Sequence, residues 1–232
     1  MFRAVFTNAD ESKKVIRCLS KRYKGFTREE ISKSTGIPYG GGLTKTLKAL
    51  IESDFVMEYI PFGETARKPY YKLVDNFCLF WIKYVEQNAN DKNFLNDNIT
   101  SSIMDSWKGI AFQELCWQHL GQIRTTLGIS GVQVSVSGWA VQGDDTKHGA
   151  QIDLLIDRKD NIINLCEMKF CMGKYSIDAE EEEKLRNRIE HVKSRAGKKT
   201  VHLTFVTTNG VAYGRHSGIV QKEITLDDLF GE

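Results

Sequence analysis

The stretch GAQIDLLIDRKDNIINLCEMK, residues 149–169, decides the fold of the second half of this 232-residue chain. Its two apolar runs are separated by the turn-type residues 158–161, and this pattern is typical of a β-hairpin. Because side chains alternate along a strand, Glu167 and Lys169 should share one face of the second strand. Asp153 interrupts the first run near the far end of the hairpin, where its carboxylate could reach that face.

Two carboxylates beside one ammonium group form the minimal set for metal-assisted phosphodiester hydrolysis. Asp153 and Glu167 supply the oxygen ligands that Mg²⁺ or Mn²⁺ prefers, and the metal would activate a water molecule and stabilise charge at phosphorus. Lys169 would orient or deprotonate that water, or neutralise developing charge. An unpaired charge inside an apolar strand is costly, which favours a functional site over the alternative, a hairpin with its charges on a solvated face.

The composition of the chain is that of an ordinary globular protein. Hydrophobic residues make up 41% and charged residues 27%, and the formal net charge is +2. No apolar run reaches the length of a membrane span, and the N-terminus lacks the apolar core of a signal peptide. The five cysteines form no CxxC pair, so neither a zinc site nor a disulfide framework is indicated. We therefore expect a cytoplasmic protein that has no membrane partner.

Charge is distributed unevenly along the chain. Residues 1–74 contain 14 Lys and Arg against 8 Asp and Glu, whereas residues 75–232 contain 18 Lys and Arg against 22 Asp and Glu. The first part is therefore suited to a polyanion such as DNA, and the second part is suited to a cation.

The first part has the pattern of a winged helix-turn-helix domain. Thr27 and Glu30 form a capping box that should open a short helix, and Gly36 supplies a turn before a second, amphipathic helix. Two β-prone runs, 55–60 and 69–74, follow the second helix and should form the hairpin known as the wing.

Several polar side chains at the second helix and on the wing lie off the apolar stripe and would face DNA. A second helix in the major groove would present its polar residues to the bases, while basic wing residues would reach phosphates or the minor groove. The predicted DNA-binding residues are Tyr39, Thr44, Lys45, Lys48, Arg67 and Lys68. Winged helices also serve as protein-docking modules, which is the alternative use of this surface.

Residues 75–98 should connect the two parts of the chain. The segment 75–85, DNFCLFWIKYV, is strongly apolar and aromatic and predicts a helix that belongs to the core. The polar stretch 88–98, rich in Asn and Asp, predicts a linker. The helix residues expected in the core are Phe77, Phe80, Trp81, Tyr84 and Val85.

Residues 99–232 should form an α/β domain of the restriction-endonuclease type. The predicted order is helix, three strands, helix and strand, which gives a central mixed sheet flanked by helices. Glu114, in the helix expected at 106–120, would add a metal contact; the alternative is a surface glutamate. The charges of the helix expected at 178–193 follow the helix dipole and predict no function. No P-loop motif occurs, so we expect no ATP site in this chain.

Several of these features together resemble the C-terminal region of archaeal-type AAA ATPases. The likeness is carried by the winged-helix pattern, the segment YKLVDNFCLFW at 71–81, and the two strands that carry Asp153 and Glu167-Met-Lys169. It implies a winged helix followed by a nuclease-like domain of the PD-(D/E)XK superfamily. The ATPase portion of those proteins is missing here, so an ATPase domain in cis or in trans is an expected partner.

The resemblance also implies roles for single residues. It places Asp153, Glu167 and Lys169 at the catalytic positions of the superfamily, and Glu114 at the helical acid. It implies a DNA-binding protein with a Mg²⁺-dependent endonuclease-like domain. The alternative is a catalytically inactive module that binds DNA or protein and serves as a scaffold for an AAA ATPase.

Overall fold

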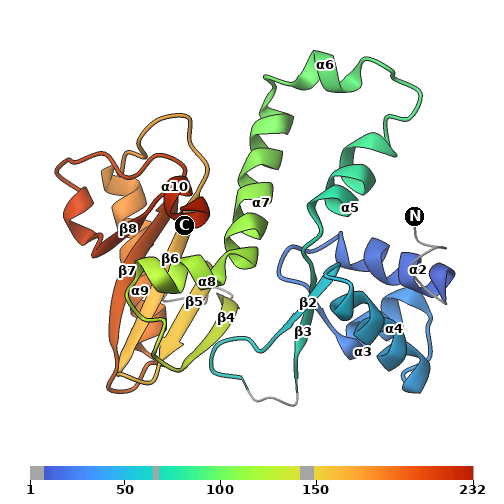
Figure 1. The fold of residues 1–232 in the computed structure, drawn as a ribbon, viewed down its shortest axis with the longest axis horizontal. Coiled ribbons are helices and arrows are strands. Elements are labelled where there is room, and N and C mark those ends of the chain that lie inside the picture. Colours follow the sequence, from blue (N-terminus) through green and yellow to red (C-terminus); the bar gives the residue numbers. More distant parts are fainter. Residues whose placement is uncertain (1–7, 65–67, 142–148, 232) are drawn as a thin grey trace. The chain divides into compact units, whose positions relative to one another are not determined.

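The structure, a computed structural model, describes residues 8–64, 68–141 and 149–231 (Figure 1). It is a mixed α/β protein that contains a three-stranded sheet and a five-stranded mixed sheet. The chain divides into two compact units, Met1–Trp107 and Lys108–Glu232. In the described part of the chain, no helix has both the length and the apolar composition that crossing a membrane requires.

The first unit packs helices and a small antiparallel sheet around one hydrophobic core. The predicted order of helices and hairpin is confirmed, whereas strand β1 has no counterpart among the predictions, because two residues carry too little periodicity. The strand order is β1-β3-β2. The elements are α2 Ala9–Leu19, β1 Phe26–Thr27, α3 Arg28–Thr35, α4 Gly41–Glu52, β2 Val56–Tyr59 and β3 Tyr70–Leu73.

Helix α3 is capped at both ends as the sequence predicts. The Thr27 hydroxyl accepts a hydrogen bond from the Glu30 amide at 3.3 Å, and the Glu30 carboxylate accepts one from the Thr27 amide at 2.7 Å. Gly36 closes the helix with a φ of +73°, a left-handed conformation that suits glycine. Leu43 and Leu47 of α4 are at most 2% exposed, as the predicted apolar stripe requires.

The aromatic segment after β3 is helical, but its expected burial is wrong. Helix α5, Asn76–Phe80, continues directly into a π-helical turn, Trp81–Val85. Phe77 and Trp81 are 59% and 47% exposed. Phe77 and Trp81 are four residues apart, so they share one side of the helix, and their ring centres lie 6.0 Å apart. The side that packs is that of Phe80, whose ring lies 5.1 Å from the ring of Trp107.

The predicted linker is not wholly irregular. It contains a short helix, α6 Phe94–Asn98, in which the Asn98 side chain donates a hydrogen bond to the Phe94 carbonyl at 2.8 Å. Helix α7, Ser102–Gln118, follows and begins in the first unit and ends in the second.

The second unit is built on a five-stranded sheet with the order β4-β5-β6-β7-β8. Strands β4, β5 and β6 are antiparallel, and β6, β7 and β8 are parallel, which confirms the predicted mixed sheet. Besides α7, the elements are α8 Leu120–Thr126, β4 Val134–Val141, β5 Ala150–Arg158, β6 Ile162–Lys169, α9 Ala179–Lys193, β7 Thr200–Thr207, a 3-10 turn Ser217–Ile219, β8 Lys222–Ile224 and α10 Leu226–Phe230.

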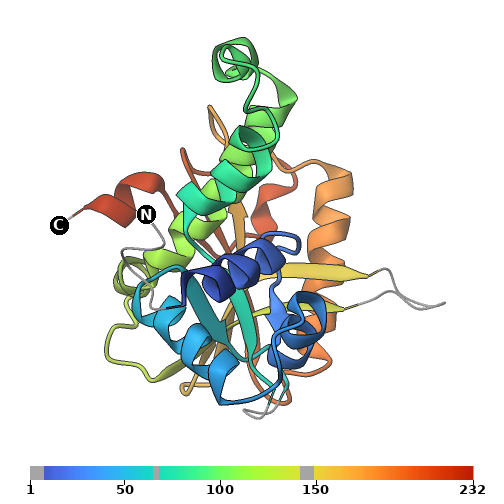
Figure 2. The same cartoon turned by 90° about the vertical axis from the view of Figure 1, so that its right-hand side faces the viewer.

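The hairpin that was expected to organise this half of the chain is present. Strands β5 and β6 pair from Leu154 and Cys166 to Asp157 and Ile163, and Asn161 turns the chain with a φ of +67°. Strand β6 is the middle strand of the sheet and is buried along most of its length. Helix α9 packs along β5 and β7, where Figure 2 shows it in orange beside the yellow strand.

Strand β5 carries an irregularity opposite β4. Ser137 pairs with Leu155. The next pair joins Trp139 to Ile152, so two steps on β4 match three steps on β5. A bulge of this kind breaks the strict alternation of side chains. Asp153 lies inside the shifted segment, so its direction does not follow from counting along the strand.

Replacing Gly25 by alanine should destabilise the first unit more than the same change at Gly36. The two glycines have φ values of +77° and +73°, so each alanine should cost about 1 kcal/mol in strain. A Cβ at Gly25 would also lie 2.2 Å from the Tyr71 carbonyl oxygen, whereas a Cβ at Gly36 would meet nothing within 4 Å. Urea unfolding followed by circular dichroism should therefore give the larger loss in free energy of unfolding for Gly25→Ala. Equal losses would contradict this difference.

Candidate functional site

The C-terminal end of β6 holds Glu167 and Lys169 side by side, as the sequence predicts. The Lys169 Nζ atom lies 3.0 Å from the Glu167 Oε1 atom. Glu167 is only 3% exposed, because β6 is the middle strand of the sheet and its face is covered by a helix. The pair thus joins a buried carboxylate to a partly exposed ammonium group, whose side chain is 27% exposed.

Helix α9 adds two more charged side chains to this pair. The Arg188 Nη1 atom lies 3.3 Å from the Glu167 Oε2 atom and 3.9 Å from the Glu181 Oε1 atom. The Glu181 Oε1 atom also lies 3.2 Å from the Lys169 Nζ atom. Each carboxylate therefore faces both cations, and the four side chains form a closed network, which we call the β6–α9 charge network.

The β6–α9 charge network fixes the protonation state of Lys169. Burial alone lowers the pKa of this ammonium group, but the charges of Glu167, Tyr175 and Glu181 outweigh it and hold the pKa above the ordinary value for lysine. Burial also raises the pKa of the Tyr175 hydroxyl. The charge of Lys169 lowers this pKa and that of Glu181 raises it, so that it stays above the ordinary value for tyrosine. Lys169 is therefore a positive charge at neutral pH in this arrangement, and not a base.

Glu114 belongs to helix α7, and Asp153 of β5 contacts this helix. The Asp153 carboxylate accepts a hydrogen bond from the Gln113 amide group at 3.0 Å. Glu114, the next residue along the helix, is fully buried. Burial raises the pKa of the Cys116 thiol, and the charges of Cys166, Asp153 and Glu114 raise it further. Both carboxylates thus lie within electrostatic range of one thiol, beside β5 and β6.

The chemistry of these side chains suits a hard divalent cation, since Mg²⁺ and Mn²⁺ take carboxylate oxygens as ligands. Within residues 8–64, 68–141 and 149–231, however, no three His, Cys, Asp or Glu side chains are grouped so that they could hold a metal ion. The two Glu167 oxygens face Lys169 and Arg188 instead. The donor types match the predicted Mg²⁺ site, and the predicted ligand set of Asp153, Glu167 and Glu114 stays a prediction.

Sequence reasoning assigned no function to Glu181 and Arg188, although a signal for them exists. Positions 181, 185, 188 and 192 lie on one face of α9. Leu185 and Val192 of this face are fully buried. Charged residues within an otherwise apolar stripe indicate a buried polar cluster. The helix dipole explains where the charges lie along α9, but it does not consider which face of the helix they are on.

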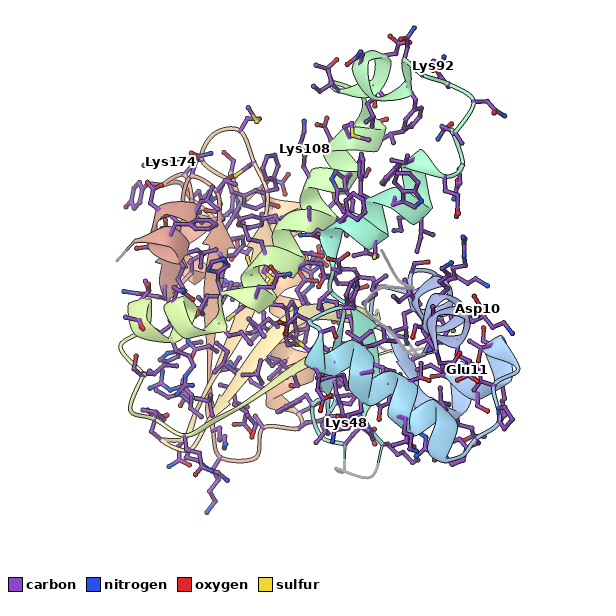
Figure 3. The ribbon with its side chains drawn as sticks, turned by 45° about the vertical axis from the view of Figure 1, so that its right-hand side comes forward. Asp10, Glu11, Lys48, Lys92, Lys108 and Lys174 are labelled. Atoms are coloured by element: carbon purple, nitrogen blue, oxygen red, sulfur yellow. The ribbon has the colours of Figure 1, made fainter. Side chains whose placement is uncertain are left out.

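Five of the six residues predicted to bind DNA lie on the surface of the first unit. Lys48, labelled on α4 in Figure 3, lies 3.6 Å from Glu52 through its Nζ atom. Arg67 lies outside the described residues. The other predicted contacts, all exposed, are Tyr39, Thr44, Lys45, Lys48 and Lys68.

Arg28 joins this surface and was not predicted. Its guanidinium carbon lies 4.3 Å from the centre of the Tyr39 ring, and its Nη2 atom donates a hydrogen bond to the Gly40 carbonyl at 2.8 Å. Arg28 therefore ties the first residue of α3 to the entrance of α4 and orients the exposed Tyr39 ring.

No known family model matches this chain, and no curated protein matches it either.

Proposed function

We propose that this protein binds DNA and hydrolyses its phosphodiester bonds with the help of Mg²⁺ or Mn²⁺. The observation that carries the proposal is the 3.0 Å contact between Glu167 and Lys169 at the buried end of β6. An acid–lysine pair on the central strand of a mixed sheet is what the proposed relation to PD-(D/E)XK nucleases requires. The second unit would be the nuclease-like domain.

The energetic cost of the charge network supports a functional role. Removing carboxylates and cations from water costs several kcal/mol per ion, and apolar residues of similar size often give equal or higher stability. Glu167 and Glu181 have side chains that are only 4% and 16% exposed. The network is therefore weak evidence for stability, and perturbed ionisable groups of this kind are common at catalytic sites.

We assign the following roles in this proposed site. Asp153 and Glu167 would hold the divalent cation, with Glu114 assisting from α7. When bound, the cation would supply a Lewis acid and an activated water molecule. The raised pKa of Lys169 favours neutralisation of charge at the phosphate over deprotonation of the water.

The first unit supports the DNA-binding part of the proposal. It combines the helix pair α3–α4 with the β2–β3 hairpin, the arrangement expected of a winged helix. Its α4 helix presents Thr44, Lys45 and Lys48 to solvent. We further propose that the chain is related to the C-terminal region of archaeal-type AAA ATPases and works with an ATPase domain in cis or in trans.

One observation favours a second candidate function. Both Glu167 oxygens already face cations of the protein itself, Lys169 and Arg188. A carboxylate neutralised in this way needs no metal, as in an inactive nuclease-like domain that serves as a scaffold for DNA, protein or an AAA ATPase. DNA binding without cleavage in either Mg²⁺ or Mn²⁺ would favour this candidate.

Glu167→Gln should abolish metal-dependent cleavage of plasmid DNA. The substitution keeps the size of the side chain and removes the proposed ligand charge, so the rate should fall on the order of 100-fold or more. The measurement is a nicking assay in Mn²⁺, with thermal unfolding to verify that the variant is folded.

The control for this experiment is Asp227→Asn, which removes an exposed carboxylate from α10 in the same unit. This variant should cleave like the wild type. Cleavage that survives Glu167→Gln at the wild-type rate would refute the assignment of Glu167.

Lys45→Ala combined with Lys48→Ala should weaken DNA binding and reduce its salt dependence. For every phosphate that α4 no longer neutralises, the slope of log K against log salt should fall in magnitude by about 0.9. Fluorescence anisotropy of a labelled duplex over a salt series measures both quantities. The matched control is Lys14→Ala with Lys92→Ala, which removes two exposed lysines that do not belong to α4. An unchanged slope for the α4 variant would exclude this helix from the DNA interface.

A further inference from the structure

The connections that follow β6 and β7 form one surface of the second unit. Strands β6 and β7 are parallel, so both connections leave the same edge of the sheet (Figure 1). Their backbones also pair, because the Tyr175 amide donates a hydrogen bond to the Gly210 carbonyl at 2.8 Å and the Ala212 amide donates one to the Tyr175 carbonyl at 2.8 Å. We call residues 170–177 and 208–216 together the loop platform.

The loop platform holds most of the large apolar side chains that the second unit exposes. Among residues 108–141 and 149–231, which the structure describes, these exposed side chains are Phe170, Met172, Tyr213 and Phe230. The first three belong to the platform, where Met172 is 87% exposed and Tyr213 is fully exposed. Single exposed apolar residues are ordinary, whereas a group of them marks an interaction surface.

The loop platform is positive, although the second half of the chain is acidic. Its two segments contain Lys174, Arg215 and His216 and no Asp or Glu, whereas residues 75–232 as a whole contain 22 Asp and Glu against 18 Lys and Arg. Lys174, which is labelled in Figure 3, and Arg215 are both exposed. Among the residues that the structure describes, neither forms an ion pair. Their charges are therefore open to an anion from outside the protein.

Carboxylates from neighbouring elements contact the platform at other points. Glu182 of α9 pairs with the His216 Nδ1 atom at 2.6 Å. Glu223 of β8 accepts a hydrogen bond from the Val211 amide at 3.0 Å. Neither contact involves the two exposed cations, so the platform keeps its positive character.

The pairing of the two segments brings the exposed ring and the cations together. Tyr175 and Val211 form a β-bridge between the segments. Lys174 directly precedes Tyr175, and Tyr213 and Arg215 follow two and four residues after Val211. Four residues of extended chain span at most about 14 Å, so a short oligonucleotide can reach all three side chains.

An exposed aromatic ring beside unpaired cations suits unpaired nucleotides. The face of a base stacks on an aromatic side chain, and the phosphates are attracted to the cations. In a duplex the bases stack on one another, so their faces are not offered to the ring. An acidic peptide would use the cations but has no base to stack. The combination therefore favours a single strand over both.

We propose that the loop platform binds single-stranded nucleic acid, with a base stacked on Tyr213 and phosphates neutralised by Lys174 and Arg215. This inference goes beyond the proposed function, because it requires neither a metal ion nor cleavage. Tyr175 joins the platform to the β6–α9 charge network, since the Lys169 Nζ atom lies 5.5 Å from the centre of its ring. A strand on the platform would therefore pass beside that network.

The experiment measures the binding of fluorescently labelled octathymidine by anisotropy in EDTA. All proteins carry Lys45→Ala and Lys48→Ala, which reduces any contribution from α4, and this parent is compared with further variants. Tyr213→Ala removes the ring, and Tyr213→Phe keeps it. The control is Phe230→Ala, which removes an exposed ring of the same unit outside the platform. Thermal unfolding verifies that each variant is folded.

Tyr213→Ala should bind octathymidine about tenfold more weakly than the parent, because one stacked base is lost. Tyr213→Phe should stay within about twofold of the parent, since stacking needs the ring and not the hydroxyl. Phe230→Ala should match the parent. A blunt duplex should bind equally well to the parent and to Tyr213→Ala.

Lys174→Ala combined with Arg215→Ala should reduce the salt dependence of octathymidine binding. The slope of log K against log salt should fall in magnitude by about 1.4, which corresponds to two phosphates on a single strand. The matched control is Lys159→Ala with Lys198→Ala, two exposed lysines at the opposite edge of the sheet, where β6 and β7 begin. This control should keep the parent slope.

The other outcomes would overturn the inference. Octathymidine affinity that is unchanged in Tyr213→Ala, or that falls equally in Tyr213→Phe, would exclude stacking on this ring. An equal loss of affinity for octathymidine and for hexaglutamate would identify a docking surface for acidic proteins instead. Absence of octathymidine binding by the parent would also overturn the inference. It would leave the proposed cleavage untouched, because no metal is present in this experiment.

Discussion

The Glu167 carboxylate is held between an ammonium and a guanidinium group inside the second unit, and the surrounding elements make this burial possible. Strand β6 must lie in the middle of the sheet for Glu167 to be covered, and α9 must return along β5 and β7 for Arg188 and Glu181 to reach it. A charge buried without these partners would be strongly destabilising. The parallel β6–β7 connection, with α9 between the strands, is therefore what allows the site to exist in the interior.

The parts of the fold that depend on local pattern follow from the sequence. The β5–β6 hairpin is visible because two apolar runs flank four turn residues, and α3 is visible because Thr27 and Glu30 satisfy its first amides. Both signals lie within a few residues of one another along the chain. The same holds for the pairing of Glu167 with Lys169, which needs only the alternation of side chains along one strand.

The remainder of the candidate site depends on contacts between distant segments. The bulge in β5 moves Asp153 out of simple alternation, and its cause lies in the pairing with β4. Arg188 and Glu181 reach the site through a helix whose packing face combines charged and apolar positions. The exposure of Phe77 and Trp81 was likewise beyond an argument from hydrophobicity, since an apolar pattern shows which residues share a helix face and not what that face packs against.

The irregular pairing of β4 with β5 has a consequence for solubility and assembly. Strand β4 is an edge of the five-stranded sheet and spans eight residues, so its outer backbone groups form a template on which a strand of another molecule could pair. The extra residue of the bulge lies on β5, and it increases the local twist of the β4–β5 pair. The same irregularity that takes Asp153 out of alternation therefore adds twist beside this long edge, which is one of the ways in which natural sheets resist edge-to-edge pairing.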